Sequence, residues 1–185
     1  TFVAWNWKAG NATTTNTSGS ITSTVSVNQA AGFSISKFIL NVANGASISW
    51  GHGLSTPPKM VIYKRANTAD SWLVYHANTD ISPNNYYLTL QTTGARSNVN
   101  GWASSTATTM TGINNWQNGD TIVAYSFSEV PGYSKFGSYI GNGSSNGPFV
   151  YTGFKPRFIM VKNTSAASHW VIIDTTRSPY NETNT

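Results

Sequence analysis

The segment Pro58 to His76, PKMVIYKRANTADSWLVYH, recurs in the same chain as Pro156 to Asp174, PRFIMVKNTSAASHWVIID. Each residue of the second copy lies 98 positions after its counterpart, so the two copies align without a gap. In both copies an apolar run precedes a lysine, a polar link follows, and a second apolar run follows a tryptophan. Two short apolar runs joined by such a link predict an antiparallel hairpin that pairs the lysine strand with the tryptophan strand.

A second pair of segments repeats with a different spacing. TFVAWNW at residues 1–7 matches TIVAYSF at residues 121–127, with Thr, Val and Ala identical and aromatic residues in equivalent places. We interpret both segments as the closing strand of a module. Alternation along the later copy places Val123, Tyr125 and Phe127 on one face, which we expect to be the core face.

These repeats divide the 185-residue chain into four parts. We expect the closing strand of a preceding module (1–9), a Thr/Ser/Asn-rich linker (10–31), one complete β module (32–130) and the truncated start of a second module (131–185). A module of roughly 100 residues has the usual size of a sandwich domain and can bury a core.

The fold class follows from the spacing of apolar residues. No stretch shows the 3.6-residue period of an amphipathic helix, whereas short β-branched and aromatic runs bounded by Gly, Asn, Pro and Ser occur throughout. The sequence predicts an all-β fold of repeated antiparallel β-sandwich modules, of jelly-roll or immunoglobulin-like size, with a barrel as the open alternative. We expect strands at residues 2–7, 33–40, 46–50, 59–65, 71–76, 86–90, 121–127, 135–140, 148–151, 157–163 and 169–174.

The composition excludes several classes of function. Charged residues make up 9% of the chain, against about 25% in ordinary soluble domains. The absence of cysteine excludes disulfides, thiolate catalysis and cysteine-bound zinc, and no run reaches the roughly 20 apolar residues of a membrane span. The net charge of +5 is scattered, so nucleic-acid binding is not predicted. A polar, uncharged and aromatic-rich chain suits an extracellular or virion surface.

We predict no enzyme activity, no cofactor and no metal site, because no recognised nucleophile frame or ligand cluster occurs. The enzymatic alternative is a glycan depolymerase, which needs two carboxylates flanking the substrate. The complete module offers Asp70, Asp80, Asp120 and Glu129. We interpret these as turn and cap residues, since Asp70 falls in a polar link and Asp120 in a Gly-Asp turn.

The histidine of WGHGL, residues 50–54, lies between two glycines and resembles a functional loop. When Gly53 is matched with Gly153, His52 falls on Thr152, so the repeat keeps the glycine but not the imidazole. We therefore predict a structural turn in which Gly53 supplies a positive φ or a close backbone approach.

Binding is predicted from aromatic, amide and hydroxyl side chains, the combination found on sugar-binding surfaces. Trp102 and Trp116 are the candidate platforms, because both lie in the loop-rich segment 97–120, and loops on a rigid scaffold often carry recognition. Tyr86 and Tyr87 are further candidates, since one of two adjacent strand residues faces outward. The alternative for each tryptophan is a place in the core.

Five segments, in order, resemble a repeated domain of tailed-bacteriophage virion proteins, particularly those of marine phages. They are TFVAWNWKAG, GHGLSTPPKMVIYKR, WLVYH, YSKFGSYIGNGSSNGPFVYTGFKPRFIMVKN and TTRSPYN. The resemblance covers nearly the whole chain, and GYSKFGSYIGNGSSNGPFVYTGFKPRFIM is its most specific part. It departs at SKFILNVANGASISW, where that family usually has a shorter Tyr-Gly-Asn stretch. That family has no assigned activity, so no site residue is carried over.

The resemblance implies a non-enzymatic virion structural protein, such as a tail fibre or tail-associated appendage, located on the surface of the virion. Homo-oligomers are implied, with trimers favoured because they are common among phage fibres. We expect other virion proteins and host cell-surface glycans as partners, with repeated modules giving avidity. The alternative is a capsid-decoration or assembly component whose aromatic residues contact only neighbouring subunits.

Overall fold

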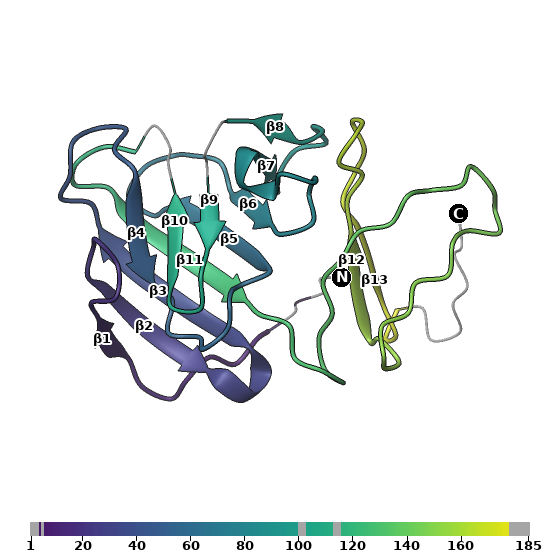
Figure 1. Cartoon of the computed structure of the whole chain (residues 1–185), viewed down its shortest axis with the longest axis horizontal. Coiled ribbons are helices and arrows are strands. Elements are labelled where there is room, and N and C mark those ends of the chain that lie inside the picture. The colour runs from purple at the N-terminus through teal and green to yellow at the C-terminus, as the bar shows by residue number, and fades with distance from the viewer. Residues whose placement is uncertain (1–3, 5, 100–102, 113–115, 178–185) are drawn as a thin grey trace.

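The computed structural model describes residues 4, 6–99, 103–112 and 116–177. Within these residues the chain forms a large antiparallel sheet and a small one that face each other as a β-sandwich (Figure 1). The predicted all-β antiparallel sandwich is confirmed, and the sheets that these residues form are open rather than closed into a barrel. The large sheet has the spatial order β1 (Thr14–Asn16), β2 (Ser23–Asn28), β3 (Phe33–Ile39), β11 (Thr121–Phe127), β5 (Met60–Arg65), β6 (Leu73–His76), β7 (Tyr86–Thr89) and β8 (Ser97–Asn98).

The small sheet and the remaining elements complete the architecture. The small sheet runs β4 (Ile48–Gly51), β10 (Thr109–Gly112) and β9 (Ala103–Ser105), and a separate hairpin pairs β12 (Phe158–Val161) with β13 (Val171–Asp174). Two 3₁₀ turns, η1 (Gln29–Ala31) and η2 (Pro83–Asn85), are the helical elements of the described ranges. None of the helices there has the length and apolar character needed to cross a membrane.

Strand β11 occupies the middle of the large sheet, between β3 and β5. Its Ile122 and Ala124 are fully buried, whereas Val123, Tyr125 and Phe127 lie half-buried on the opposite face. The prediction that the aromatic face is the core face is therefore wrong. The small sheet packs on the face of β11 that carries Ile122, Ala124 and Ser126, where the small side chains of Ala124 and Ser126 leave room for bulky aromatic residues.

The core between the sheets is built around Trp50 of β4, whose side chain is 0% exposed. Its ring stacks on Phe38 of β3 with centroids 4.9 Å apart and meets Tyr63 of β5 at 6.1 Å. Trp116 closes the cluster at 6.2 Å from Trp50. Large rings in offset and edge contact dominate the energetics of such a core.

The region predicted as a linker, residues 10–31, is part of the sandwich instead. It contributes β1 and β2 to the edge of the large sheet, and Ile21 and Val25 are buried in it. Alternation in TSTVSV, residues 22–27, explains the error: Thr, Ser and Val suit a strand whose inner face carries Val25. A Thr/Ser-rich composition alone therefore does not mark a linker.

The predicted hairpin is confirmed in both copies, with the same register. Met60 pairs with His76 in β5–β6, and the equivalent Phe158 pairs with Asp174 in β12–β13. Gly53, in the turn of the first copy, has φ of 75°, and its counterpart Gly153 has φ of 83°. The repeat thus preserves both the glycine turn and the strand pairing that follows it.

A second complete module is not formed by the described residues. The predicted strands 135–140 and 148–151 are absent, and their apolar side chains have no facing layer: Ile140 is 91% and Phe149 89% exposed. Of the predicted strand 2–7, residues 2, 3 and 5 lie outside the described residues, and the rest is not in a strand.

Val25→Ala tests whether residues 10–31 belong to the sandwich. Val25 is 1% exposed, so removing two buried methyl groups should lower the free energy of unfolding by about 2 kcal/mol, measured by urea denaturation. Thr24→Ala, at the exposed neighbouring position of the same strand, should change it by less than about 0.5 kcal/mol. If both substitutions changed the free energy of unfolding by equally small amounts, residues 10–31 would be a linker.

Candidate functional site

The hairpin β12–β13 docks against the loop that follows β7 (Figure 1). The Ser168 N–H donates to the Thr93 carbonyl at 2.8 Å, and the Arg96 N–H donates to the Thr164 carbonyl at 3.0 Å. The Lys162 ammonium donates to the same Thr93 carbonyl at 3.1 Å. It also donates to two carbonyls of its own turn, so its charge is used to hold the loop and the hairpin together.

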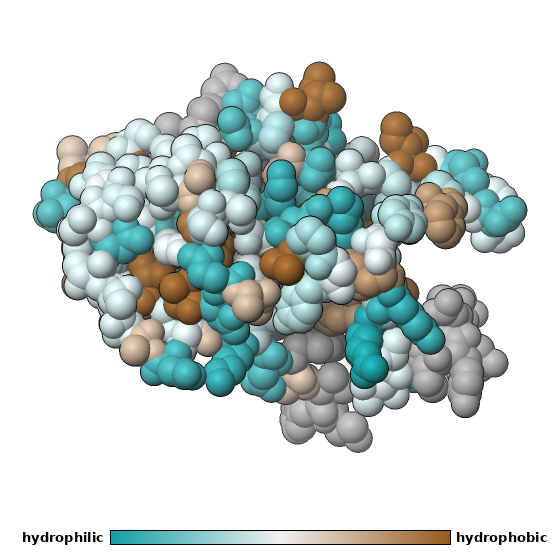
Figure 2. Space-filling view, turned by 60° about the horizontal axis from the view of Figure 1, so that its bottom comes forward, coloured by the Kyte–Doolittle hydropathy of each residue, from teal (hydrophilic) through white to brown (hydrophobic). Residues whose placement is uncertain are grey.

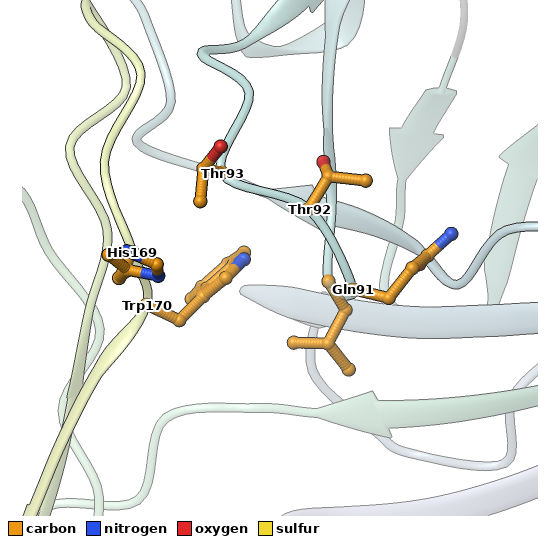
Figure 3. Close-up of a pocket in the computed structure, with 6 residues that line it drawn as sticks. Gln91, Thr92, Thr93, His169 and Trp170 are labelled. Carbon is orange, nitrogen blue, oxygen red and sulfur yellow. The ribbon is translucent and has the colours of Figure 1, made fainter.

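An open groove of about 350 Å³ lies where the loop and the hairpin meet. Its volume falls at the lower end of the roughly 300–1,000 Å³ typical of small-molecule sites. Figure 3 shows Thr92 and Thr93 on the loop side, with His169 and Trp170 on the hairpin side. The groove, which we call the Trp170 groove, is lined by Leu90, Gln91, Thr92, Thr93, His169 and Trp170.

The indole of Trp170 is held in place by its own hydrogen bond. Its Nε1–H donates to the Thr89 carbonyl at 3.1 Å, so the donor is satisfied within the protein and the ring face remains for contact. Gln91 accepts from the Trp72 N–H through Oε1 at 3.0 Å, and its side chain points away from the groove in Figure 3. The other polar side chains that line the groove are those of Thr92, Thr93 and His169.

The equivalent tryptophan of the first copy has a different environment. The Lys64 ammonium lies 5.3 Å from the centre of the Trp72 ring, and Tyr125 packs at 6.2 Å. The alignment of the two copies matches Trp72 with Trp170 and predicts that both lie in a hairpin. It therefore did not indicate Trp170 as a site residue. The alignment matches residue types but does not show which side chains cover each ring.

The predicted platforms fall in other places. Trp116 is buried at 3% exposure and packs edge-on against Tyr63 at 5.4 Å, so it belongs to the core and offers no exposed surface. Its loop position misled the prediction, because the ring itself packs into the aromatic cluster of Trp50 and Tyr63. Trp102 lies outside the described residues. Tyr86 is half-buried with the Arg96 guanidinium 4.8 Å above its ring, and Tyr87 packs against the core.

Every acidic side chain in the described part of the chain forms an ion pair. Arg65 binds both Asp70 (2.7 Å) and Asp120 (3.2 Å). The other pairs are Arg96 with Asp80, Lys135 with Glu129, and Arg177 with Asp174. None of these residues lines the Trp170 groove, and no group of three metal-ligating side chains occurs among the residues described.

For two of these carboxyls, Glu129 and Asp174, hydrogen bonds lower the pKa. The Lys135 ammonium holds the pKa of Glu129 below its ordinary value, and the Arg177 backbone N–H does the same for Asp174. A general acid in glycoside hydrolysis needs the opposite shift, because it must keep its proton near neutral pH.

His52 is a structural residue, as the comparison of the two copies predicts. Its ring is fully buried, and Nδ1 accepts from the Leu54 N–H at 3.1 Å while Nε2 lies 3.2 Å from the Thr106 carbonyl. These partners fix the neutral tautomer with the proton on Nε2. Burial lowers the pKa of His52, and burial also lowers the pKa of His76.

Comparison with known proteins gives a family but no function. A family model described as a domain of unknown function (DUF7483) matches residues 1–185. No curated protein and no solved structure matches the chain.

The lowered pKa of His52 predicts a pH-dependent stability. Between the usual pKa of about 6.5 and the lower folded pKa, the unfolded chain binds more protons, so the free energy of unfolding should fall as the pH falls. Urea titrations at pH 7.5 and pH 5 should show a smaller loss in His52→Gln than in the wild type. Each histidine can change the free energy of unfolding by at most about 1.4 kcal/mol per pH unit. An identical loss of unfolding free energy in the wild type and in His52→Gln would contradict a lowered pKa of His52.

Proposed function

The chain belongs to the DUF7483 family of domains of unknown function, and we propose that it is a non-enzymatic, glycan-binding structural module of a phage tail fibre or related virion appendage. The observation that carries the glycan part is the Trp170 groove. It is an open hollow lined by an indole ring that a hydrogen bond orients, by two threonines and by a histidine. The virion part rests on the sequence resemblance described above.

The chemistry of the groove suits a neutral sugar. A pyranose has an apolar C–H face that stacks on an indole, and hydroxyls around its rim that pair with neutral donors and acceptors. Thr92, Thr93 and His169 supply such groups without a carboxylate nearby. Lys162 is engaged by three backbone carbonyls, which leaves the groove without an available cation for an acidic ligand.

A binding role, rather than hydrolysis, is supported by the ion pairing of the described carboxylates. Asp80 and Asp120, the residues most relevant to a depolymerase, are each bound by an arginine. Weak single sites of this kind bind a surface more strongly when several are linked on one particle. Once one site has bound, the others meet their ligands at a high effective concentration. A homo-oligomeric fibre, trimeric as the resemblance suggests, would present several grooves to a host surface alongside other virion proteins.

A purely structural role is the second candidate, and one observation favours it. Residues 133–151, which we call the arm, leave the sandwich as an extended segment (Figure 1). Hydrophobic groups project on this side of the molecule in Figure 2. Exposed apolar side chains on one segment can mark protein contacts. The arm carries Tyr133, Tyr139, Ile140, Phe149, Val150 and Tyr151, all exposed. In this role the arm would contact neighbouring virion subunits.

Trp170→Ala tests the glycan proposal on an array of neutral hexose and N-acetylhexosamine oligosaccharides. The wild-type chain should bind a subset of them, and the variant should bind roughly tenfold more weakly because the stacking surface is lost. Thr93→Val removes one groove hydroxyl, keeps the backbone carbonyl that holds the hairpin, and should weaken binding severalfold.

The matched control is Tyr151→Ala, which removes an exposed aromatic ring of the arm and should leave array binding unchanged. Circular dichroism and thermal unfolding of each variant confirm that the fold is retained. Equal binding by the wild type and both groove variants, or no binding by the wild type, would reject the groove and favour the structural role.

A further inference from the structure

The hairpin β12–β13 exposes a face that its counterpart β5–β6 buries. In β5–β6 the residues of this face are at most 8% exposed and belong to the core between the sheets. They are Val61, Tyr63, Leu73 and Tyr75, which pair across the two strands. The residues 98 positions later, which we call the hairpin face, are Ile159, Val161, Val171 and Ile173. Here Ile159 is 41% exposed and Val171 is 47% exposed, so the second copy presents an apolar core face to solvent.

In the first copy, strands that precede the hairpin in the sequence cover this face. Trp50 of β4 packs against Tyr63 of the face with ring centroids 6.1 Å apart. Phe38 of β3 stacks on Trp50 at 4.9 Å and completes the aromatic layer. The chain then passes from β4 into β5 through the turn at Gly53. The first copy therefore shows what fits such a face, namely an apolar strand from the segment before the hairpin.

The second copy contains equivalents of both covering segments, and they lie in the arm. The tripeptide SKF occurs at residues 36–38, in β3, and again at 134–136, with the same spacing of 98 as the hairpins. When Gly53 is matched with Gly153, Trp50 falls on Val150. Residues 148–151 form no strand, and Phe149 is 89% and Val150 50% exposed. The covering segment and the hairpin face are thus both exposed in the single chain.

The base of the arm is fixed on the sandwich rather than on its own hairpin. Glu129 accepts from the Lys135 ammonium at 2.8 Å and from the Phe136 N–H at 3.2 Å. The Phe136 ring, the equivalent of Phe38, lies 6.3 Å from the ring of His76 in β6. From this base the arm extends past the hairpin and away from the sandwich (Figure 1). Its apolar residues are therefore held where a neighbouring chain can reach them.

We propose that the hairpin face is the docking surface for the arm of a second copy of this chain. Phe149 and Val150 of one copy then lie over Ile159 and Val171 of the next, as Trp50 lies over β5 in the sandwich. The driving force is the burial of two apolar surfaces that are exposed in the single chain. Since the arm and the hairpin face are different surfaces, two copies can exchange arms reciprocally, or several can close a ring. This inference rests on the structural role proposed for the arm and not on glycan binding.

Sedimentation velocity over a series of protein concentrations tests the association. The wild-type chain should form assemblies of two or more copies. Ile159→Glu and Phe149→Glu each place a charge in the contact and should raise the dissociation constant at least about tenfold. The matched control is Ile81→Glu, which adds the same charge at a residue that is 99% exposed in the loop before η2. It should associate as the wild type does.

The outcomes separate the docking surface from the other proposals. A wild-type chain that stays monomeric at every concentration would overturn the inference. If Phe149→Glu weakened association and Ile159→Glu did not, the arm would bind another surface, which overturns this docking site but keeps the structural role. Trp170→Ala alters the Trp170 groove and not the hairpin face, so it should associate normally whether or not the wild type binds glycans.

Cysteine cross-linking identifies the two surfaces directly. The chain has no cysteine, so Phe149→Cys and Ile159→Cys each introduce a single thiol. When the two variants are mixed and mildly oxidised, intact mass should show more disulfide-linked heterodimer than a mixture of Phe149→Cys with Ile81→Cys. Equal yields in the two mixtures would overturn the hairpin face as the docking surface.

The double variant Phe149→Cys with Ile159→Cys distinguishes docking between copies from closure within one chain. Docking between copies predicts disulfides that join different chains, seen as dimers and larger species on a non-reducing gel. An intramolecular bond in a monomer would show that the arm closes on its own hairpin, and this would overturn the proposal.

Discussion

The fold depends on the return of β11 to the middle of the large sheet. This strand begins at Thr121 yet pairs with β3, which ends at Ile39, and with β5, which ends at Arg65. Both pairings are long-range, so their loop-closure entropy is offset only when the whole sheet forms. Once β11 is in place, Ile122 and Ala124 line the floor of the core, and the small sheet with Trp50 can pack on it.

Sequence reasoning succeeded where a local pattern determines the structure. The two hairpins, the turn at Gly53 and the structural histidine each follow from spacing or from comparison of the two copies. It failed where burial depends on distant segments. The alternation of side chains predicts that β11 has two faces. Which of them is buried depends on where the small sheet packs, and the sequence of β11 does not show this. For the same reason Trp116, in a loop, is part of the core.

The repeat also shows how one sequence element can take two roles. Trp72 is covered by Lys64 and Tyr125, whereas Trp170 stands in an open groove, and the equivalent Lys162 binds carbonyls instead of covering a ring. The residue types are the same, so the difference comes from the neighbouring segments. A groove built in this way is not visible in a single sequence, because its walls come from elements about 80 residues apart, as Thr89 and Trp170 illustrate.

Native-state hydrogen exchange of β11 tests the central claim most directly. If the sheet depends on this strand, the amides of Ile122, Ala124 and Tyr125 should exchange only through global unfolding. Their opening free energy would then equal the unfolding free energy from urea denaturation. Exchange of β11 at a lower free energy, while Trp50 and its strand stay protected, would show that the core forms without it and would contradict the account.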